Sequence, residues 1–154
     1  MKFSTQEEYG LRCLIQIAKE GADGSLTIQE IGRREGLTTP HVAKLLMILR
    51  KSGLITSTRG QAGGYTIARD PRTVLVGEAL AALGGKLYDE SFCDRHVGTH
   101  DVCSHSVGCA VRDLWEDVQI AIDSVVNKIT LADLIRLSNV EFFASPPPRE
   151  KVIQ

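Results

Sequence analysis

Three of the chain's four cysteines lie close together in its second half. Cys93, Cys103 and Cys109 are separated by nine and five residues. Cysteine thiolates are the usual ligands of iron-sulfur clusters, so this group predicts a cluster site that still needs a fourth ligand. The same segment also contains three histidines, His96, His100 and His105. The spacing alone leaves two alternatives open, because one histidine could complete a zinc site with the three cysteines, and the thiols could instead be redox-active or inert.

Basic residues form the second chemical feature of the chain. The whole chain has a net charge of -1, yet residues 33–72 contain 8 basic residues and only 2 acidic ones. Residues 1–72 hold 11 basic and 7 acidic residues, a net charge of +4, whereas residues 73–154 hold 7 and 12, a net charge of -5. A local basic surface on a nearly neutral protein indicates an anionic partner for that part of the chain only.

The basic segment has the pattern of a helix-turn-helix. A capping box at residues 27–30 predicts a helix that runs to Glu35, and Gly36 supplies the turn. The next helix is predicted over residues 40–51, and Gly53 follows its end. The second helix of such a unit enters the major groove of DNA, so residues 40–51 are the predicted recognition helix.

A β-hairpin wing is predicted directly after the recognition helix. Residues 54–58 and 65–68 have the composition of two short strands. The residues between them, 59–64, include three glycines, which allow the positive φ values that a hairpin tip needs. With an amphipathic helix over residues 5–18, these elements predict a winged helix-turn-helix domain over residues 1–72.

Eight residues of this domain are the predicted DNA contacts. They are polar, basic or glycine positions on the recognition helix and the wing: Thr38, Thr39, His41, Lys44, Arg50, Lys51, Arg59 and Gly60. One of the two threonines caps the helix, and hydroxyl and N–H groups at a helix start suit phosphate oxygens. Base edges would be read by His41, Ala43 or Lys44, and Arg59 could enter a minor groove. The charge alone fits a solvated helical hairpin equally well, and its combination with the wing favours DNA.

The second half of the chain is predicted to be helical around one long loop. A short helix is predicted over residues 76–83, and residues 86–108 show no periodicity. A loop of that length indicates a function or disorder. From residue 110 an apolar stripe continues to residue 129 and predicts a helix long enough to need a partner. A second capping box starts a short helix over residues 130–137.

The predicted fold class is therefore mainly α with a small β wing. It combines the winged helix-turn-helix domain with a long C-terminal dimerisation helix. Four parts follow in chain order: the DNA-binding domain at 1–72, a connecting helix and cysteine-bearing cluster loop at 73–109, the dimerisation helix and a short C-terminal helix at 110–140, and a disordered tail at 141–154.

Several other classes of protein do not match the sequence. The first 18 residues alternate charged and apolar types, so we expect no signal peptide, no membrane partner and a cytoplasmic location. An enzyme is not expected, because no Ser/His/Asp arrangement or pair of catalytic carboxylates is evident. Residues 59–64 are rich in glycine but lie between strands, whereas a nucleotide-binding loop opens a helix.

Four motifs, which together extend over nearly the whole chain, resemble a known family. They are Glu-Tyr-Gly-Leu-Arg at 8–12, the recognition-helix run at 39–55, Arg-Gly-Gln-Ala-Gly-Gly-Tyr at 59–65, and the segment from Cys103 to Trp115. With these motifs the chain resembles the Rrf2 (Rrf-two) family of bacterial regulators, which includes the IscR, NsrR and RirA types. The resemblance implies a homodimer that binds a roughly palindromic operator in double-stranded DNA, by family habit as a repressor.

The resemblance also implies a 2Fe-2S or 4Fe-4S cluster and its ligands. The three family cysteines correspond to Cys93, Cys103 and Cys109. The nine-residue gap before the second cysteine is longer than the five typical of the IscR and NsrR types. IscR-like members have a histidine where this chain has Arg112, whereas NsrR-like members use a carboxylate from the first helix of the other subunit, at the position of Glu8. A capping box with Thr5 is the competing role for Glu8. The fourth ligand of the cluster could instead be one of the loop histidines, or the protein could supply none.

The implied mechanism links the cluster to the DNA. Cluster assembly is expected to order residues 86–109, to dock them on the other subunit's DNA-binding domain and to fix the spacing of the two recognition helices. Oxygen, nitric oxide or iron starvation would reverse this change. The alternative regulator senses through zinc or direct thiol oxidation without a cluster. Cys13 lies outside the motif and is predicted to be a packed thiol.

Overall fold

The computed structural model describes residues 3–58, 63–97 and 108–139. Its elements in chain order are α1 (Thr5–Lys19), α2 (Ile28–Glu35), α3 (Thr39–Lys51), β1 (Ile55–Thr58), β2 (Gly64–Ile67), the 3-10 turn η1 (Pro71–Thr73), α4 (Val76–Gly84), the 3-10 turn η2 (Asp94–His96), α5 (Ala110–Val126) and α6 (Leu131–Asn139). This order of helices around one two-stranded hairpin confirms the predicted fold class.

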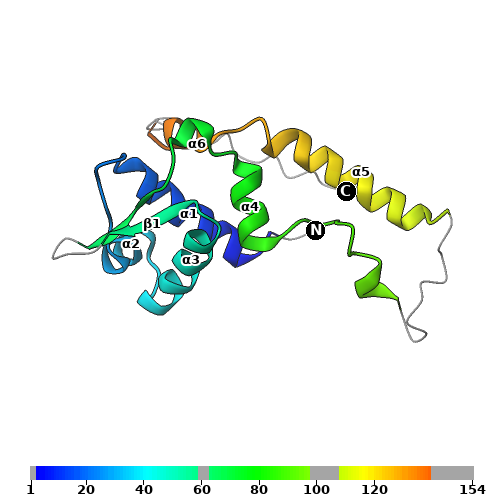
Figure 1. The fold of residues 1–154 in the computed structure, drawn as a ribbon, viewed down its shortest axis with the longest axis horizontal. Coiled ribbons are helices and arrows are strands. Elements are labelled where there is room, and N and C mark those ends of the chain that lie inside the picture. The colour runs from blue at the N-terminus through cyan, green and yellow to red at the C-terminus, as the bar shows by residue number, and fades with distance from the viewer. Residues whose placement is uncertain (1–2, 59–62, 98–107, 140–154) are drawn as a thin grey trace, which may run out of the picture.

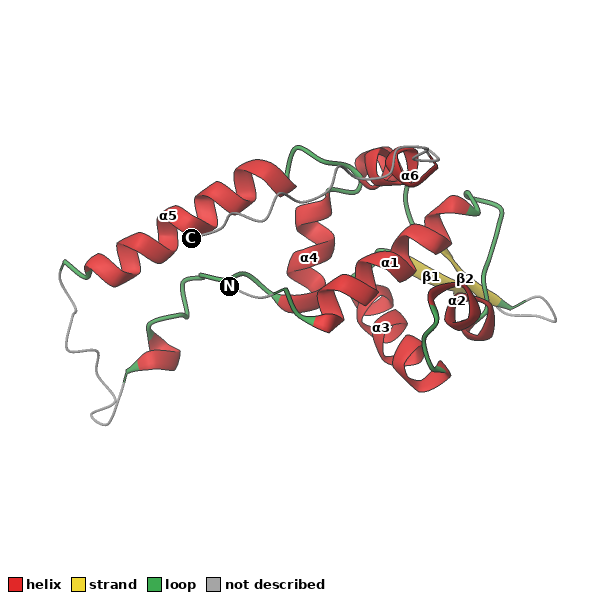
Figure 2. Cartoon of the chain, turned by 180° about the vertical axis from the view of Figure 1, so that it is seen from behind, coloured by secondary structure: helices red, strands yellow, loops and turns green. Residues whose placement is uncertain are grey.

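Two parts of the molecule differ in shape (Figure 1). The body consists of α1 to α4, the hairpin and α6. The arm consists of residues 85–97 together with α5, and both of its segments run outward from the body in the two opposite views (Figures 1 and 2). The part of the predicted cluster loop at 98–107 and the predicted tail lie outside the described residues.

The body is built on one hydrophobic core. α1, α2 and α3 each turn an apolar stripe inward, and α4 closes the core against α1 and α3. The fully buried large side chains include Leu14, Ile17, Ile31, Leu45, Leu46 and Leu49. Burial of such aliphatic side chains provides most of the favourable free energy of folding, about 1.5–3 kcal/mol for each.

Local signals in the sequence explain where most helices begin and end. Thr27 and Glu30 form the predicted capping box of α2, with the Glu30 main-chain N–H donating to Thr27 Oγ1 over 3.2 Å. Gly36 ends α2 with a left-handed backbone (φ 67°), which turns the chain into α3. The predicted box at the start of the first helix is wrong, because it lies one residue earlier, between Ser4 and Glu7.

The wing is an antiparallel hairpin in which Ile55 pairs with Ile67 and Thr58 pairs with Gly64. Leu26 extends the sheet by two main-chain hydrogen bonds with Tyr65, at 2.8 and 3.0 Å. This close approach requires a glycine at position 64, since a Cβ atom there would lie 2.8 Å from the Leu26 carbonyl oxygen. The hairpin is therefore joined to the body at its base.

The chain returns to the body after α5. The Val76 main-chain N–H donates to the Ile129 carbonyl over 2.9 Å, and the Leu131 N–H donates to the Val74 carbonyl over 2.8 Å. The apolar stripe predicts that Ile129 continues the long helix. This prediction is wrong, because the pairing with Val76 takes Ile129 out of α5, which ends at Val126. Leu131 then lies in the core of the body, so α6 packs on α1.

Candidate nucleic-acid interface and cysteine segment

The start of α3 is exposed. Thr38 is the N-cap residue, with an extended backbone, but its side chain forms no capping hydrogen bond. The predicted cap by a threonine side chain is therefore wrong, although Thr38 does occupy the cap position. Thr39 and Pro40 are also exposed. Since the helix does not use the Thr38 hydroxyl as a cap, nothing in α3 competes with its predicted contact to a phosphate oxygen, which stays a prediction.

Three basic residues follow on α3. Lys44, Arg50 and Lys51 are exposed, and none of them forms an ion pair with a residue in the described ranges. Among the described residues, eight other basic side chains form ion pairs with carboxylates, whereas Lys19, Arg33 and Lys128, like the three on α3, do not. The positive charge of α3 is thus not neutralised within the described part of the protomer, which is the arrangement expected of a surface that binds phosphates.

The wing tip contains two further predicted contacts. Arg59 and Gly60 lie outside the described residues. The base of the tip is well defined, because the Gly64 N–H donates to Thr58 Oγ1 over 3.1 Å and this hydroxyl donates to the Gly64 carbonyl over 3.2 Å. These two hydrogen bonds close the described part of the hairpin at Thr58 and Gly64.

Two of the three predicted cluster cysteines are described. Cys93 precedes the turn η2, and Cys109 is the N-cap residue of α5, with the Arg112 main-chain N–H 3.5 Å from its Sγ. Both are free and partly exposed. Cys103 lies outside the described residues, as do His100 and His105. Among the residues that are described, no group of three or more metal-ligating side chains comes together.

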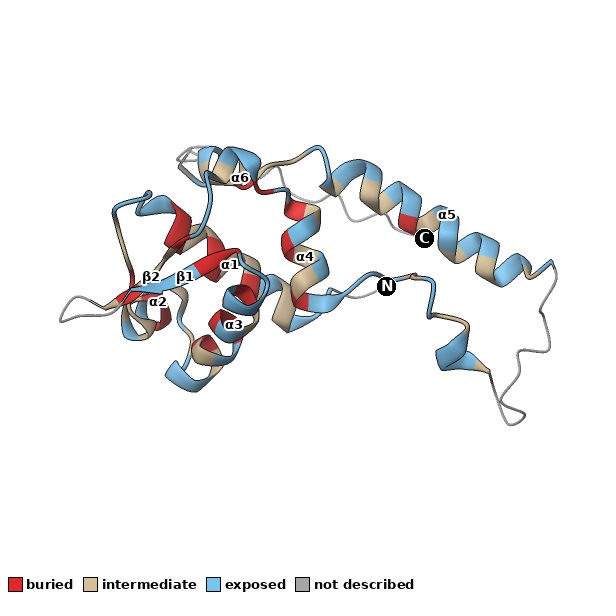
Figure 3. Cartoon of the chain, viewed as in Figure 1, coloured by how far each residue is buried: buried red, intermediate tan, exposed pale blue. Residues whose placement is uncertain are grey.

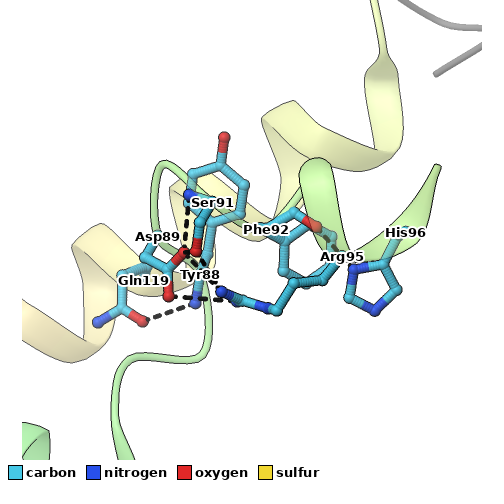
Figure 4. A network of polar contacts seen from close by, with 7 residues as sticks. All are labelled: Tyr88, Asp89, Ser91, Phe92, Arg95, His96 and Gln119. Carbon is cyan, nitrogen blue, oxygen red and sulfur yellow. Dashed lines mark hydrogen bonds and ion pairs between the residues drawn. The ribbon is translucent and has the colours of Figure 1, made fainter. Parts of the chain in front are cut away.

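A polar network fixes the segment just before Cys93 (Figure 4). The Tyr88 main-chain N–H donates to Gln119 Oε1 on α5 over 3.1 Å. Asp89 accepts hydrogen bonds from the Ser91 N–H at 2.9 Å and hydroxyl at 2.7 Å, and from the Arg95 guanidinium at 3.1 Å. Since Gln119 is the buried residue of the arm, the cysteine segment is anchored to α5 by a polar contact.

Three rings follow one another along the same segment (Figure 4), with Phe92 tilted against Tyr88 and stacked on His96. The Phe92 ring lies 5.4 Å from Tyr88 and 4.3 Å from His96. His96 Nδ1 lies 2.7 Å from the Phe92 carbonyl oxygen. Burial raises the pKa of Tyr88, with a smaller contribution from the neighbouring Cys93 and Glu116. Cys93 and the first turns of α5 therefore both act electrostatically on Tyr88. The turn η2 and the start of α5 both lie toward the outer end of the arm (Figures 1 and 2).

Cys13 differs from these cysteines. It is fully buried in the core of the body, and burial raises its pKa to about 12. A thiol with that pKa is not a nucleophile or a ready metal ligand at neutral pH. The prediction that Cys13 is a packed thiol is confirmed.

Comparison with known proteins identifies the group to which this arrangement belongs. The sequence model of the Rrf2 protein family, described as an iron-dependent transcriptional regulator, matches residues 3–137. The chain belongs to the Rrf2 family. It is 35% identical over 136 residues to protein rrf2 of Nitratidesulfovibrio vulgaris, which covers 88% of both chains. It is 31% identical over 141 residues to the transcriptional regulator IscR of Photobacterium profundum, over 92% of this chain and 79% of the relative.

Solved structures of Rrf2-type regulators have the same fold. T. potens IscR superimposes with a TM-score of 0.73 at 30% identity, over 95% of this chain and 94% of that one. CymR, the global cysteine regulator of B. subtilis, superimposes with a TM-score of 0.71 at 27% identity, over 89% and 98%. The protein is thus a DNA-binding transcriptional regulator with a winged helix, and not an enzyme. In the described part of the chain, no helix is long and apolar enough to cross a membrane.

The structure explains the Rrf2 motif at residues 8–12. The Tyr9 ring stands perpendicular to the His41 ring of α3 at 5.6 Å, and the Arg12 guanidinium lies over Tyr9 at 5.4 Å. Arg12 Nε donates to Glu35 Oε2 over 2.6 Å, and this hydrogen bond raises the pKa of Arg12. The Glu35 side chain is only 6% exposed. The motif therefore joins α1, α2 and the recognition helix, and it positions the predicted base-reading residue His41.

Glu8 is available for a role outside α1. Glu7, not Glu8, accepts the capping hydrogen bond from the Ser4 N–H, at 2.7 Å. Glu8 is exposed. Among the described residues, its carboxylate accepts no hydrogen bond and forms no ion pair. The competing capping role predicted for Glu8 is therefore excluded.

One exposed residue of α3 is absent from the predicted DNA contacts. Met47, in the middle of α3, is 59% exposed. Its apolar type places it among the core residues in a count of hydrophobic positions, and only its helical position opposite Val42, Leu45 and Leu49 could have indicated otherwise. The outward surface of the recognition helix therefore combines unpaired cations with one large apolar side chain.

Proposed function

We propose that this Rrf2 regulator is a cluster-sensing repressor, which binds a palindromic operator in the cytoplasm as a homodimer. An iron-sulfur cluster on Cys93, Cys103 and Cys109 would set its affinity for DNA. The observation that carries the proposal is that Cys93 and Cys109 are both free and partly exposed, and that the turn η2 after Cys93 and the start of α5 at Cys109 both lie toward the outer end of the arm. The DNA-binding part of the proposal rests on the predicted DNA contacts. These lie on α3, from Thr38 to Lys51, and on the wing, at Arg59 and Gly60.

The homodimer is supported by the surface of α5. Val111, Leu114 and Val125 are 55–60% exposed and share one side of this 17-residue helix by their spacing. A monomer would leave this apolar stripe in water. Pairing with the same stripe of a second copy would bury it, and it would set two recognition helices at a defined separation, as half-sites about 34–36 Å apart require.

The described cysteines fit an iron-sulfur cluster. Both thiols are free, and the Arg112 N–H at the first turn of α5 points to Cys109 Sγ, which is the kind of donor that stabilises a ligating sulfur. When bound, a cluster supplies a redox-sensitive group whose loss releases the thiolates. Glu8 of the partner subunit is the proposed fourth ligand, because its carboxylate is exposed and is not used as a cap.

The contacts of the arm suggest how the cysteine segment acts on the dimer. The Tyr88 main-chain N–H donates a hydrogen bond to Gln119 Oε1, and Lys86 forms an ion pair of 3.1 Å with Asp123. Gln119 also donates to Asp123 Oδ1 over 2.9 Å. A rearrangement around Cys93 would therefore displace α5, the proposed dimerisation helix. The expected result is a change in the separation of the recognition helices and so in affinity for the operator.

The test compares protein purified without oxygen with protein purified in air. A duplex operator is first selected from a random pool with the anaerobic full-length protein. We expect the anaerobic protein to be coloured and to bind this duplex with a different affinity from the aerobic protein in a mobility-shift assay. Cys93→Ala, Cys103→Ala and Cys109→Ala should remove the colour and this difference, whereas the matched control Cys13→Ala should retain both. A colourless protein that binds equally well in both states would refute cluster sensing.

Direct thiol chemistry is the second candidate, and one observation favours it. Staphylococcus aureus CymR was solved in an oxidised form, and it superimposes on this chain with a TM-score of 0.67 at 27% identity. Zinc binding by the same residues belongs to this candidate as well. Metal analysis separates the cases: iron with sulfide supports the cluster, zinc supports a zinc site, and the absence of metal together with operator binding that depends on thiol oxidation supports direct sensing.

A further inference from the structure

Met47 stands apart on the recognition helix. The buried side of α3 is formed by Val42, Leu45, Leu46 and Leu49. At 100° per residue, position 47 points almost directly away from that side, which agrees with its exposure of 59%. A long apolar side chain in that place adds nothing to the core of the protomer. Its surroundings therefore have to indicate its role.

Those surroundings combine small apolar residues with cations. Pro40 and Ala43 lie seven and four residues before Met47, on the same side of α3, and they are exposed and half-exposed. Lys44 precedes it by three residues and Arg50 follows it by three. Because these cations have no ion pair with the described residues, they are available to bring a DNA backbone toward this strip.

Only one group in the major groove of DNA suits an apolar side chain at that position. Thymine presents a 5-methyl group there, whereas the other base edges present hydrogen-bond donors and acceptors. The small side chain of Ala43 allows the helix to approach closely, and the unbranched side chain of Met47 can adapt to a methyl group. We propose that Met47 reads the 5-methyl group of a thymine in each operator half-site. The inference rests on the proposed palindromic operator.

The experiment removes that methyl group alone. A duplex is selected from a random pool with the full-length anaerobic protein, and each thymine of a half-site is then replaced in turn by deoxyuracil. We expect one position at which wild-type affinity falls about fourfold, the equivalent of one buried methyl group, and about fifteenfold when both half-sites are changed. In Met47→Ala this penalty should disappear, and in Met47→Leu, which keeps an apolar side chain, it should persist.

A charge variant provides the matched control. Lys51→Ala should weaken binding to all duplexes by a similar factor and should keep the deoxyuracil penalty, because a phosphate contact carries no base information. If Met47→Ala retains the full penalty, or if no thymine position responds in the wild type, the inference is wrong while DNA binding stands. If no duplex is selected at all, the proposed operator binding fails, and the inference fails with it.

Discussion

The body and the arm of this regulator are stabilised in opposite ways. Every buried hydrophobic residue of the described chain belongs to the body, from Cys13 to Leu131. In the arm the buried residue is Gln119, a polar side chain, while apolar residues such as Val111 and Leu114 are exposed. Figure 3 shows the buried segments gathered in the body and α5 largely exposed or intermediate. The body therefore has its own core, whereas the arm within one protomer does not.

This difference is consistent with the proposed division of the molecule into a sensing arm and a DNA-binding body. A segment with few buried apolar contacts has a small free energy of local opening, so a ligand or partner can change its conformation at little cost. The arm contains Cys93 and Cys109, and the body contains α3, the predicted recognition helix. A stable DNA-binding body with a weakly stabilised arm is thus the arrangement expected of a regulator whose sensing and binding parts are separate.

The largest expected contrast between body and arm is in thiol reactivity. In protein prepared in air, without metal and with a reductant, iodoacetamide at pH 8 should modify Cys93 and Cys109 readily. It should modify Cys13 more slowly by a factor on the order of a thousand or more, since burial raises the pKa of Cys13 to about 12 and reaction requires unfolding. Mass spectrometry of peptides measures the three rates. Rapid labelling of Cys13 in the native protein would show that the body is not the more stable part.

Paired leucine variants give the next largest effect. Leu14→Ala in the body should lower the free energy of unfolding by about 2–5 kcal/mol, because Leu14 is fully buried. Leu114→Ala in the arm should change the free energy of unfolding of the monomer by less than about 0.5 kcal/mol, since Leu114 is 55% exposed, and should instead weaken self-association. Urea unfolding and analytical ultracentrifugation measure the two quantities. A Leu114→Ala protein that associates as well as the wild type would contradict the view that the arm is stabilised by a partner.

The smallest expected effect is the pH dependence of the cap at the start of α2. Hydrogen bonds from the Thr27 main-chain N–H and hydroxyl lower the pKa of Glu30 from its ordinary 4.5. A lowered carboxyl pKa stabilises the fold above the ordinary value, and this contribution is lost as the pH falls through the folded pKa. The stability difference between wild type and Glu30→Gln should therefore shrink as the pH decreases from 7 to about 3. Thermal unfolding at each pH measures it, and a constant difference would exclude the carboxylate as the cause.

The helix boundaries and the wing were largely predictable because their signals are local. The capping box of Thr27 with Glu30, the left-handed Gly36 and the glycine-rich hairpin depend on residues that are close in the sequence. The errors arose where two local signals competed or where a distant contact intervened. Ser4 with Glu7 was preferred over Thr5 with Glu8, and the pairing of Ile129 with Val76 ended α5 at Val126.

The candidate site was predictable by residue type and less so by role. Composition identified the cysteines, the basic helix and the packed thiol Cys13, and the family resemblance pointed to Glu8. The exposure of Met47 depends on how α3 lies on the core, and the link from Tyr88 to Gln119 joins residues 31 positions apart. Neither could be inferred from neighbouring residues, because both are set by the packing of separate elements.

The sequence by itself determined the elements of this protein, its family and the chemistry of its cysteines and cations, because capping, periodicity and side-chain type act over a few residues. The tertiary structure decided which groups are available. It buries Cys13, and it gives the capping role at the start of α1 to Glu7 and not to Glu8. It also places His41 against Tyr9 and anchors the cysteine segment to α5 through Gln119. Those outcomes depend on which helices pack together, and that packing is decided by the whole core at once.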